Sequence, residues 1–154
     1  MAKTIPFSQH TQAARARAAK AALLPLPRAT ADELALQVHL ALDALRRGKG
    51  NLNDAQTLTQ TMILVSLLTD AGYGTLAPES LRRADALIAA CFDEGRATGV
   101  WALDMAGFRS FAEIVTLYDH QLQKVPFWAV AEASDKLDRF KAGLPFDPVA
   151  KKRA

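Results

Sequence analysis

The chain has 154 residues, of which 30 are Ala and 21 are Leu, whereas only 7 are Val and 4 are Ile. Ala and Leu favour helices and large sheets draw on β-branched residues, so the composition excludes an all-β fold. Half of the residues are hydrophobic and 23% are charged, which excludes a disordered or collagen-like chain and fits one globular domain. A single cysteine, Cys91, excludes a disulfide scaffold.

The net charge of +3 is distributed unevenly. Residues 1–28 hold five basic residues and no acid, residues 29–142 hold 11 basic and 15 acidic residues, and residues 143–154 hold three basic residues and Asp147. The sequence thus predicts a helical domain over 29–142 between two basic tails. Basic tails attract phosphates or acidic surfaces, or simply keep a chain soluble. Tail residues that could make such contacts are Arg15, Arg17, Lys20, Lys151, Lys152 and Arg153.

The hydrophobic runs are too short for a membrane span, which needs about 18 apolar residues. The longest candidate, Met62–Leu68, is interrupted by Ser66. The apolar stretch at Leu23 and Leu24 is stopped by Pro25, so it does not resemble a secretory signal. Together with the lone cysteine, this predicts a cytoplasmic protein without a membrane partner.

The N-terminal segment is expected to be a poorly ordered or partly helical tail. Gln12–Ala22 is rich in Ala but has no apolar stripe before Leu23, and an isolated helix of this length is marginal in water. Pro25 and Pro27 then stop the helix.

Helix-start signals divide the body into a compact, all-α domain of five helices. Thr30 with Glu33 reads as a capping box, and Asn53 with Gln56 repeats the signal. Pro78 suits a helix start, as does Pro126. The expected helices lie near residues 30–47, 53–71, 78–94, 98–123 and 126–141. The second, apolar on nearly all sides, is expected at the centre, and Gly95–Gly99 is expected to form the joint before the fourth.

The sequence offers little for catalysis. Its three histidines, His10, His39 and His120, have no second His or Cys at metal-ligand spacing, so neither a metal site nor a cofactor is expected. Cys91 lies in an apolar stretch and is expected to pack in the core. A thiol nucleophile built from Cys91 and His120 is the distant alternative. We therefore expect a protein that is not an enzyme.

Binding to a macromolecule is the better supported class of function. A helix-turn-helix across residues 84–104 would give a recognition helix nearly bare of base-reading side chains, so DNA contacts would come from loops and tails. Basic clusters at the first interhelix loop and on the third helix, Arg96 in the predicted joint, and large aromatic residues near helix ends are the candidates for interaction. These residues are Arg46, Arg47, Lys49, Arg82, Arg83, Arg96, Trp101, Phe127 and Trp128.

Four motifs carry a resemblance to a known family. They are Arg47-Gly48-Lys49, Gly72-Tyr73-Gly74, Gly95-Arg96-Ala97-Thr98-Gly99 and Asp119-His120-Gln121-Leu122. Across roughly residues 40–140, the chain resembles small helical proteins of bacterial genomes, phages and plasmids labelled "Fis family transcriptional regulator". The resemblance implies a mobile-element setting, and the label implies DNA binding. It supplies no catalytic residues.

The favoured hypothesis is a helical interaction protein of a phage or plasmid. It would bind a host or element-encoded protein through a helical face, modulate or inhibit it, and use its basic tails as an aid. The alternative is a DNA-associated transcriptional regulator acting as a dimer. A small-molecule enzyme is the distant third.

Overall fold

The computed structural model describes residues 7–143, with side chains from residue 12 onward. Within this part the chain is all-α, as predicted, but it has six helices, where the sequence predicted five. They are α1 (Phe7–Ala22), α2 (Arg28–Arg46), α3 (Leu52–Asp70), α4 (Pro78–Thr98), α5 (Met105–Lys124) and α6 (Phe127–Lys141). The five predicted helices correspond to α2–α6, and the sixth, α1, lies in the N-terminal segment.

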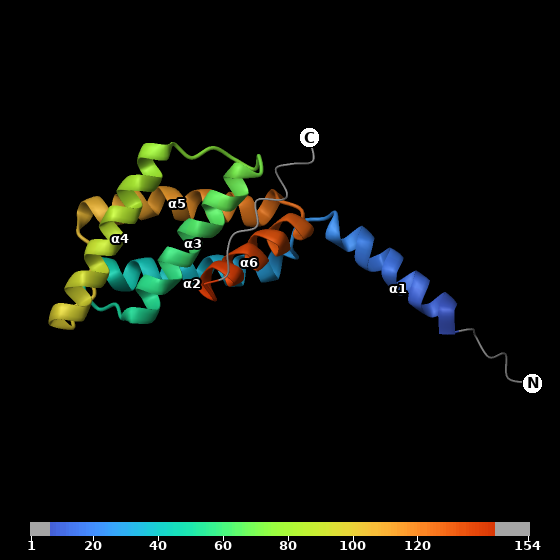
Figure 1. The fold of residues 1–154 in the computed structure, drawn as a ribbon, viewed down its shortest axis with the longest axis horizontal. Helices are drawn as coiled ribbons and strands as arrows, with labels where there is room; N and C mark the ends of the chain where they lie inside the picture. The colour runs from blue at the N-terminus through green and yellow to red at the C-terminus, as the bar shows by residue number, and fades with distance from the viewer. Residues whose placement is uncertain (1–6, 144–154) are drawn as a thin grey trace, which may run out of the picture.

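Helix α1 projects away from the body formed by the other five helices (Figure 1). Residues 12–21 are all exposed. At its base, the backbone N–H of Phe127 donates to the carbonyl of Leu24 over 2.8 Å, which fixes the chain against the start of α6. A helix this exposed gains almost no stability from burial of its own surface.

Helix α3 lies at the centre of the body, as its apolar character predicted. It contacts α2, α4, α5 and α6. Leu58 and Val65 are completely buried, and they pack in one core with Leu45 of α2 and Phe111 and Ile114 of α5. Because four helices share α3, few of its side chains remain exposed.

Two helix starts differ from the predicted capping boxes. Helix α2 begins at Arg28 after Pro27 and has no side-chain cap, so Thr30 lies inside the helix. Helix α3 has a capping box two residues earlier than predicted, between Asn51 and Asp54. Asn51 accepts from the Asp54 N–H and Asp54 accepts from the Asn51 N–H, both over 3.0 Å.

The predicted joint at residues 95–99 is wrong. Helix α4 continues through Gly95 to Thr98 and ends at Gly99, whose φ of 75° suits glycine. Gly95 is needed for packing, because a Cβ at this position would overlap the indole ring of Trp101. The turn of a helix-turn-helix therefore does not form at Gly95.

Residues 99–104 form a non-helical connection where the sequence predicted the start of the fourth helix. Trp101 and Leu103 attach this connection to the end of α2. The Gly50 N–H donates to the Trp101 carbonyl over 3.2 Å, and the Leu103 N–H donates to the Leu45 carbonyl over 2.9 Å. Helix α5 then starts after Asp104, whose carboxylate accepts from the Gly107 N–H over 2.8 Å.

None of the helices described over residues 7–143 is long and apolar enough to cross a membrane.

Candidate interaction surface

Helices α2 and α5 leave an open groove along one face of the body. Its volume is about 730 Å³. We call it the α2–α5 groove; its lining residues are His39, Leu40, Leu42, Asp43, Arg46, Arg47, Phe108, Ala112, Val115 and Thr116. Most of its lining is apolar, and its charged residues come from the C-terminal half of α2.

Arg46 and Arg47 are held in place at one rim of the groove. Asp43 pairs with Arg46 and with Arg47, each over 2.9 Å. The hydrogen bond from Arg46 and the positive charge of Arg47 hold the pKa of the Asp43 carboxyl below its usual value, although partial desolvation opposes them. The Arg46 guanidinium also stacks over Phe108, 5.4 Å from the ring centre. Since two arginines face one carboxylate, the rim has a net charge of one positive unit.

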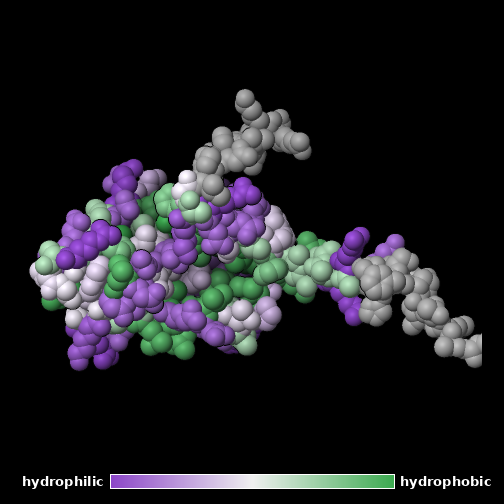
Figure 2. All heavy atoms as spheres, turned by 60° about the horizontal axis from the view of Figure 1, so that its bottom comes forward, coloured by the Kyte–Doolittle hydropathy of each residue, from purple (hydrophilic) through white to green (hydrophobic). Residues whose placement is uncertain are grey.

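Leu40 is an exposed apolar side chain in the lining of the groove. It is 60% exposed, whereas the opposite face of its helix, α2, packs in the core. Figure 2 shows hydrophobic atoms exposed among hydrophilic ones where the lower side of Figure 1 comes forward. The groove thus combines an exposed apolar side chain with a charged rim.

A second, smaller hollow continues along the same two helices beyond His39. Its volume is about 280 Å³, and we call it the Asp119 hollow. Ala31, Asp32, Ala35, Leu36, His39, Asp119 and Gln123 line it. His39 Nε2 and Asp119 Oδ2 are 2.7 Å apart, which links α2 to α5 between the hollow and the groove. The other carboxylate oxygen of Asp119, Oδ1, is buried and accepts no hydrogen bond within the described part of the chain.

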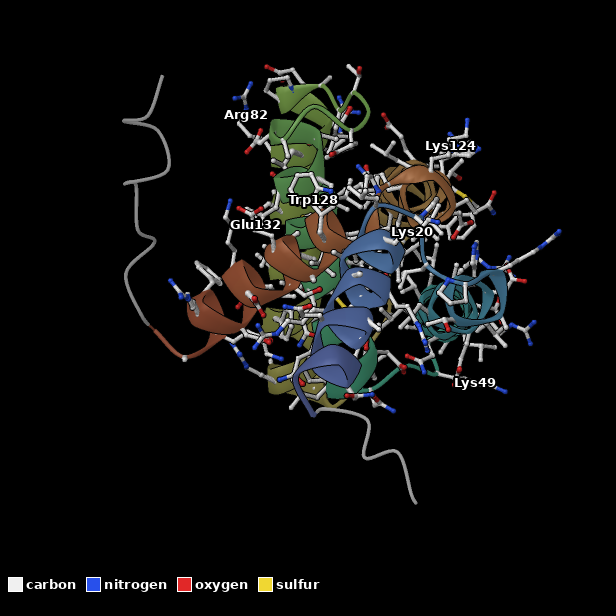
Figure 3. The ribbon with its side chains drawn as sticks, turned by 90° about the vertical axis from the view of Figure 1, so that its right-hand side faces the viewer. Lys20, Lys49, Arg82, Lys124, Trp128 and Glu132 are labelled. Carbon is white, nitrogen blue, oxygen red and sulfur yellow. The ribbon has the colours of Figure 1, made fainter. Side chains whose placement is uncertain are left out.

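A third hollow lies between α3 and α6 beside Trp128. It is small, about 140 Å³, and we call it the Trp128 pocket. In Figure 3 the Trp128 side chain lies between α6 and α3, and Glu132 follows it along α6. Trp128 and Phe127 are each 45% exposed, so this end of the molecule combines packing with exposed aromatic surface.

The remaining predicted candidates are spread over other parts of the body. Arg82 pairs with Glu79 on the first turns of α4, and Arg83 is exposed beside it. Arg96 stacks over Phe92, 5.3 Å from the ring centre. Phe92 in turn packs edge-on against Trp101, with ring centres 5.7 Å apart. Trp101 thus contributes to packing at the end of α4.

The structure brings Arg46 and Arg47 together at the groove and leaves the other basic residues apart from it. Lys49 follows in the loop after α2, and Figure 3 shows it at the edge of the body. Arg15, Arg17 and Lys20 are exposed on α1. The predicted tail contacts Lys151, Lys152 and Arg153 lie outside the described residues.

The thiol–imidazole pair is not formed. Cys91 is buried on α4, and burial raises the pKa of its thiol, whereas His120 is exposed on α5. An activated thiol needs a lowered pKa, so this environment opposes nucleophilic chemistry at Cys91. Over residues 7–143 no three His, Cys, Asp or Glu side chains form a group that could hold a metal ion.

Sequence reasoning missed Leu36, Leu40 and Phe108 as surface residues. Phe108 is partly buried against the core and also lines the groove. The two leucines did carry a signal. They lie one turn apart on α2 and outside the buried stripe of Val38, Leu42 and Leu45.

Neither a protein-family model, nor a curated protein, nor a solved structure was found to match this chain.

Proposed function

We propose that this chain is a non-enzymatic interaction protein that receives a helical segment of another protein in the α2–α5 groove. The observation that carries the proposal is the groove itself, with exposed Leu40, the Phe108 ring and a rim of fixed arginines. An amphipathic helix lays its apolar side into such a groove and supplies its charges at the edge.

The charges of the groove specify the partner's chemistry. Arg46 and Arg47 face a single carboxylate, that of Asp43, so one positive charge is left at the rim. A partner segment with an apolar stripe and an acidic residue beside it therefore fits best. Since the two arginines are already held by Asp43 and Phe108, little side-chain freedom is lost on binding.

The biological setting rests on the resemblance of residues 40–140 to small helical proteins of phages and plasmids. In that setting the partner is a host or element-encoded protein that the chain modulates or inhibits. A DNA-associated regulator is the second candidate, and the exposed Arg15, Arg17 and Lys20 on α1 favour it. A small-molecule enzyme remains the third, with no supporting contact between Cys91 and His120.

The test is affinity capture from native cell lysate with and without nuclease, using the full chain and two variants. Leu40→Glu places a charge in the groove. Leu52→Glu makes the same change at a 44% exposed leucine in the first turn of α3, which does not line the groove. A protein recovered in stoichiometric amount after nuclease, retained by Leu52→Glu and reduced about tenfold or more by Leu40→Glu, supports the proposal.

Two results would overturn it. Equal recovery of the partner by Leu40→Glu and the unchanged chain would place the binding site elsewhere. Recovery of nuclease-sensitive material only, lost when residues 1–28 are removed, would establish the DNA-associated reading instead.

A further inference from the structure

The exposed helix α1 carries only basic charges, and the Asp119 hollow is lined by two acids. From this we infer that two copies of the chain exchange their α1 helices, each docking in the Asp119 hollow of the other. The Asp119 hollow adjoins the α2–α5 groove and shares His39 with it, but this inference does not depend on binding of a partner in the groove.

Helix α1 has a face suited to docking. At 100° per residue, Ala16, Ala19 and Leu23 share one side of the helix. Arg15 and Lys20 lie at the two edges of this side. The hydrogen bond from the Leu23 N–H to the Lys20 carbonyl continues the helical turn, and Leu23 is 69% exposed. This side of the helix thus consists of two alanines and, one residue beyond the end of α1, the exposed Leu23, between two positive charges.

The Asp119 hollow presents the matching pattern. Ala31 and Ala35 are small residues that allow close approach of a helix, and Leu36 is 56% exposed at the hollow. Asp32 comes from α2 and Asp119 from α5, so the two acids lie on opposite walls. A helix with cations at both edges would place one against each acid.

The two acids differ in what a second copy could contact. Asp119 lines the hollow with a side chain that is 27% exposed; its Oδ2 contacts His39 and its Oδ1 is buried, so a docked cation would meet the charge of this carboxylate at the rim of the hollow. Asp32 has only a long contact of 3.9 Å with Arg28, whose side chain is 93% exposed. Such an exposed pair contributes little and yields readily to a better one.

A second copy is the occupant that the charges favour. The described part of α1 carries Arg15, Arg17 and Lys20 with no acid, whereas residues 29–142 carry four more acids than bases. The α1 helix leaves the body directly before α2, the helix that forms one wall of the hollow. Viewed along α1, the helix points toward the reader with α2 and α5 on one side and α6 on the other (Figure 3).

Exposed apolar residues gather where the two copies would meet. Leu24 is 60% exposed, and its carbonyl is bonded to the backbone of Phe127, which is 45% exposed like its neighbour Trp128. Exposed apolar clusters of this kind mark association surfaces. In a twofold dimer with exchanged helices, the base of each α1 approaches the base of the other.

The test uses charge exchange between two variants. The helix variant is Arg15→Glu with Lys20→Glu, and the hollow variant is Asp32→Lys with Asp119→Lys. Sedimentation equilibrium should give twice the 16.7 kDa chain mass for the unchanged protein and the single mass for each variant alone. An equimolar mixture of the two variants should return to the double mass, because each helix then meets a hollow of opposite charge.

Two single substitutions on α1 that change the net charge by the same amount serve as a control. Arg15→Glu should weaken self-association about tenfold or more, whereas Arg17→Glu, on the far side of α1, should change it less than about twofold. Circular dichroism checks that the hollow variant folds. Asp32→Lys alone, at an exposed site, repeats the test without touching the His39–Asp119 contact.

A single chain mass for the unchanged protein at all concentrations from about 1 to 100 µM would overturn the inference. So would a mixture of the two variants that stays at the single mass. A double mass that both variants retain would also overturn it, because the contact would then lie elsewhere.

Discussion

Gly95 shows how a tertiary contact can require one particular residue. Helix α4 continues through this glycine, and the Trp101 ring occupies the space that a side chain at position 95 would need. Gly95→Ala should therefore lower the free energy of unfolding by about 2 kcal/mol, although Ala normally favours a helix. Urea unfolding measures the change, and Trp101→Val in the same chain should remove most of it. A stabilising Gly95→Ala would contradict the packing.

Cys91 gives a second prediction at the residue scale. Its buried thiol, with a raised pKa, should react roughly tenfold or more slowly with a thiol reagent than in the unfolded chain. As the pH rises, the thiol ionises in the unfolded chain before it ionises in the folded chain. The contribution of Cys91 to the free energy of unfolding is therefore complete below the pKa of the unfolded thiol and declines above it. Urea unfolding at pH 7.5 and 9.5, with Cys91→Ala as the control, measures the decline. An equal decline in Cys91→Ala would contradict the assignment.

At the scale of the element, the start of α3 is specified by reciprocal hydrogen bonds and the start of α2 is not. Asn51→Ala should cost about 1 kcal/mol of stability, and Asp54→Ala a similar amount. Thr30→Ala, at the site of the predicted but absent cap, should change stability by less than about 0.5 kcal/mol. Thermal unfolding of the three variants measures these losses of stability. A larger loss for Thr30→Ala than for Asn51→Ala would contradict this account of the helix starts.

The elements also show what sequence alone can predict. The all-α class and the start of α4 at Pro78 follow from local preferences, which act on neighbouring residues. The connection at residues 99–104 does not follow from local preferences. It depends on contacts of Trp101 with Gly95 and with Gly50, and Gly50 is distant from Trp101 in the sequence. Helix and strand propensities cannot predict such a tertiary contact.

The candidate surface was predictable to a similar extent. Charge clustering indicated Arg46 and Arg47, whereas Leu40 lies outside the buried stripe and could be taken as an ordinary surface leucine. Leu40 lines a groove only because α5 supplies Phe108, Ala112 and Val115 to the same lining. The partners of His39 and Asp119, 80 residues apart, likewise depend on the packing of α2 against α5.

At the scale of the whole molecule, two surfaces on the same pair of helices have different charge. The α2–α5 groove has a basic rim, and the Asp119 hollow has two acids, with the His39–Asp119 contact between them. On the two proposals, an acidic amphipathic helix would bind in the groove and a basic helix in the adjoining hollow. Leu40→Glu should thus leave the oligomeric state unchanged while it weakens binding of the partner about tenfold or more.

The most direct measurement is photo-cross-linking in the native host, with a photoreactive phenylalanine placed at position 40 or, as the control, at position 52. If the α2–α5 groove is the binding site, position 40 should cross-link one defined protein through an apolar helical segment, identified by mass spectrometry, and position 52 should not. Equal products from both positions, or no protein product from position 40, would contradict the claim that the α2–α5 groove is the binding site.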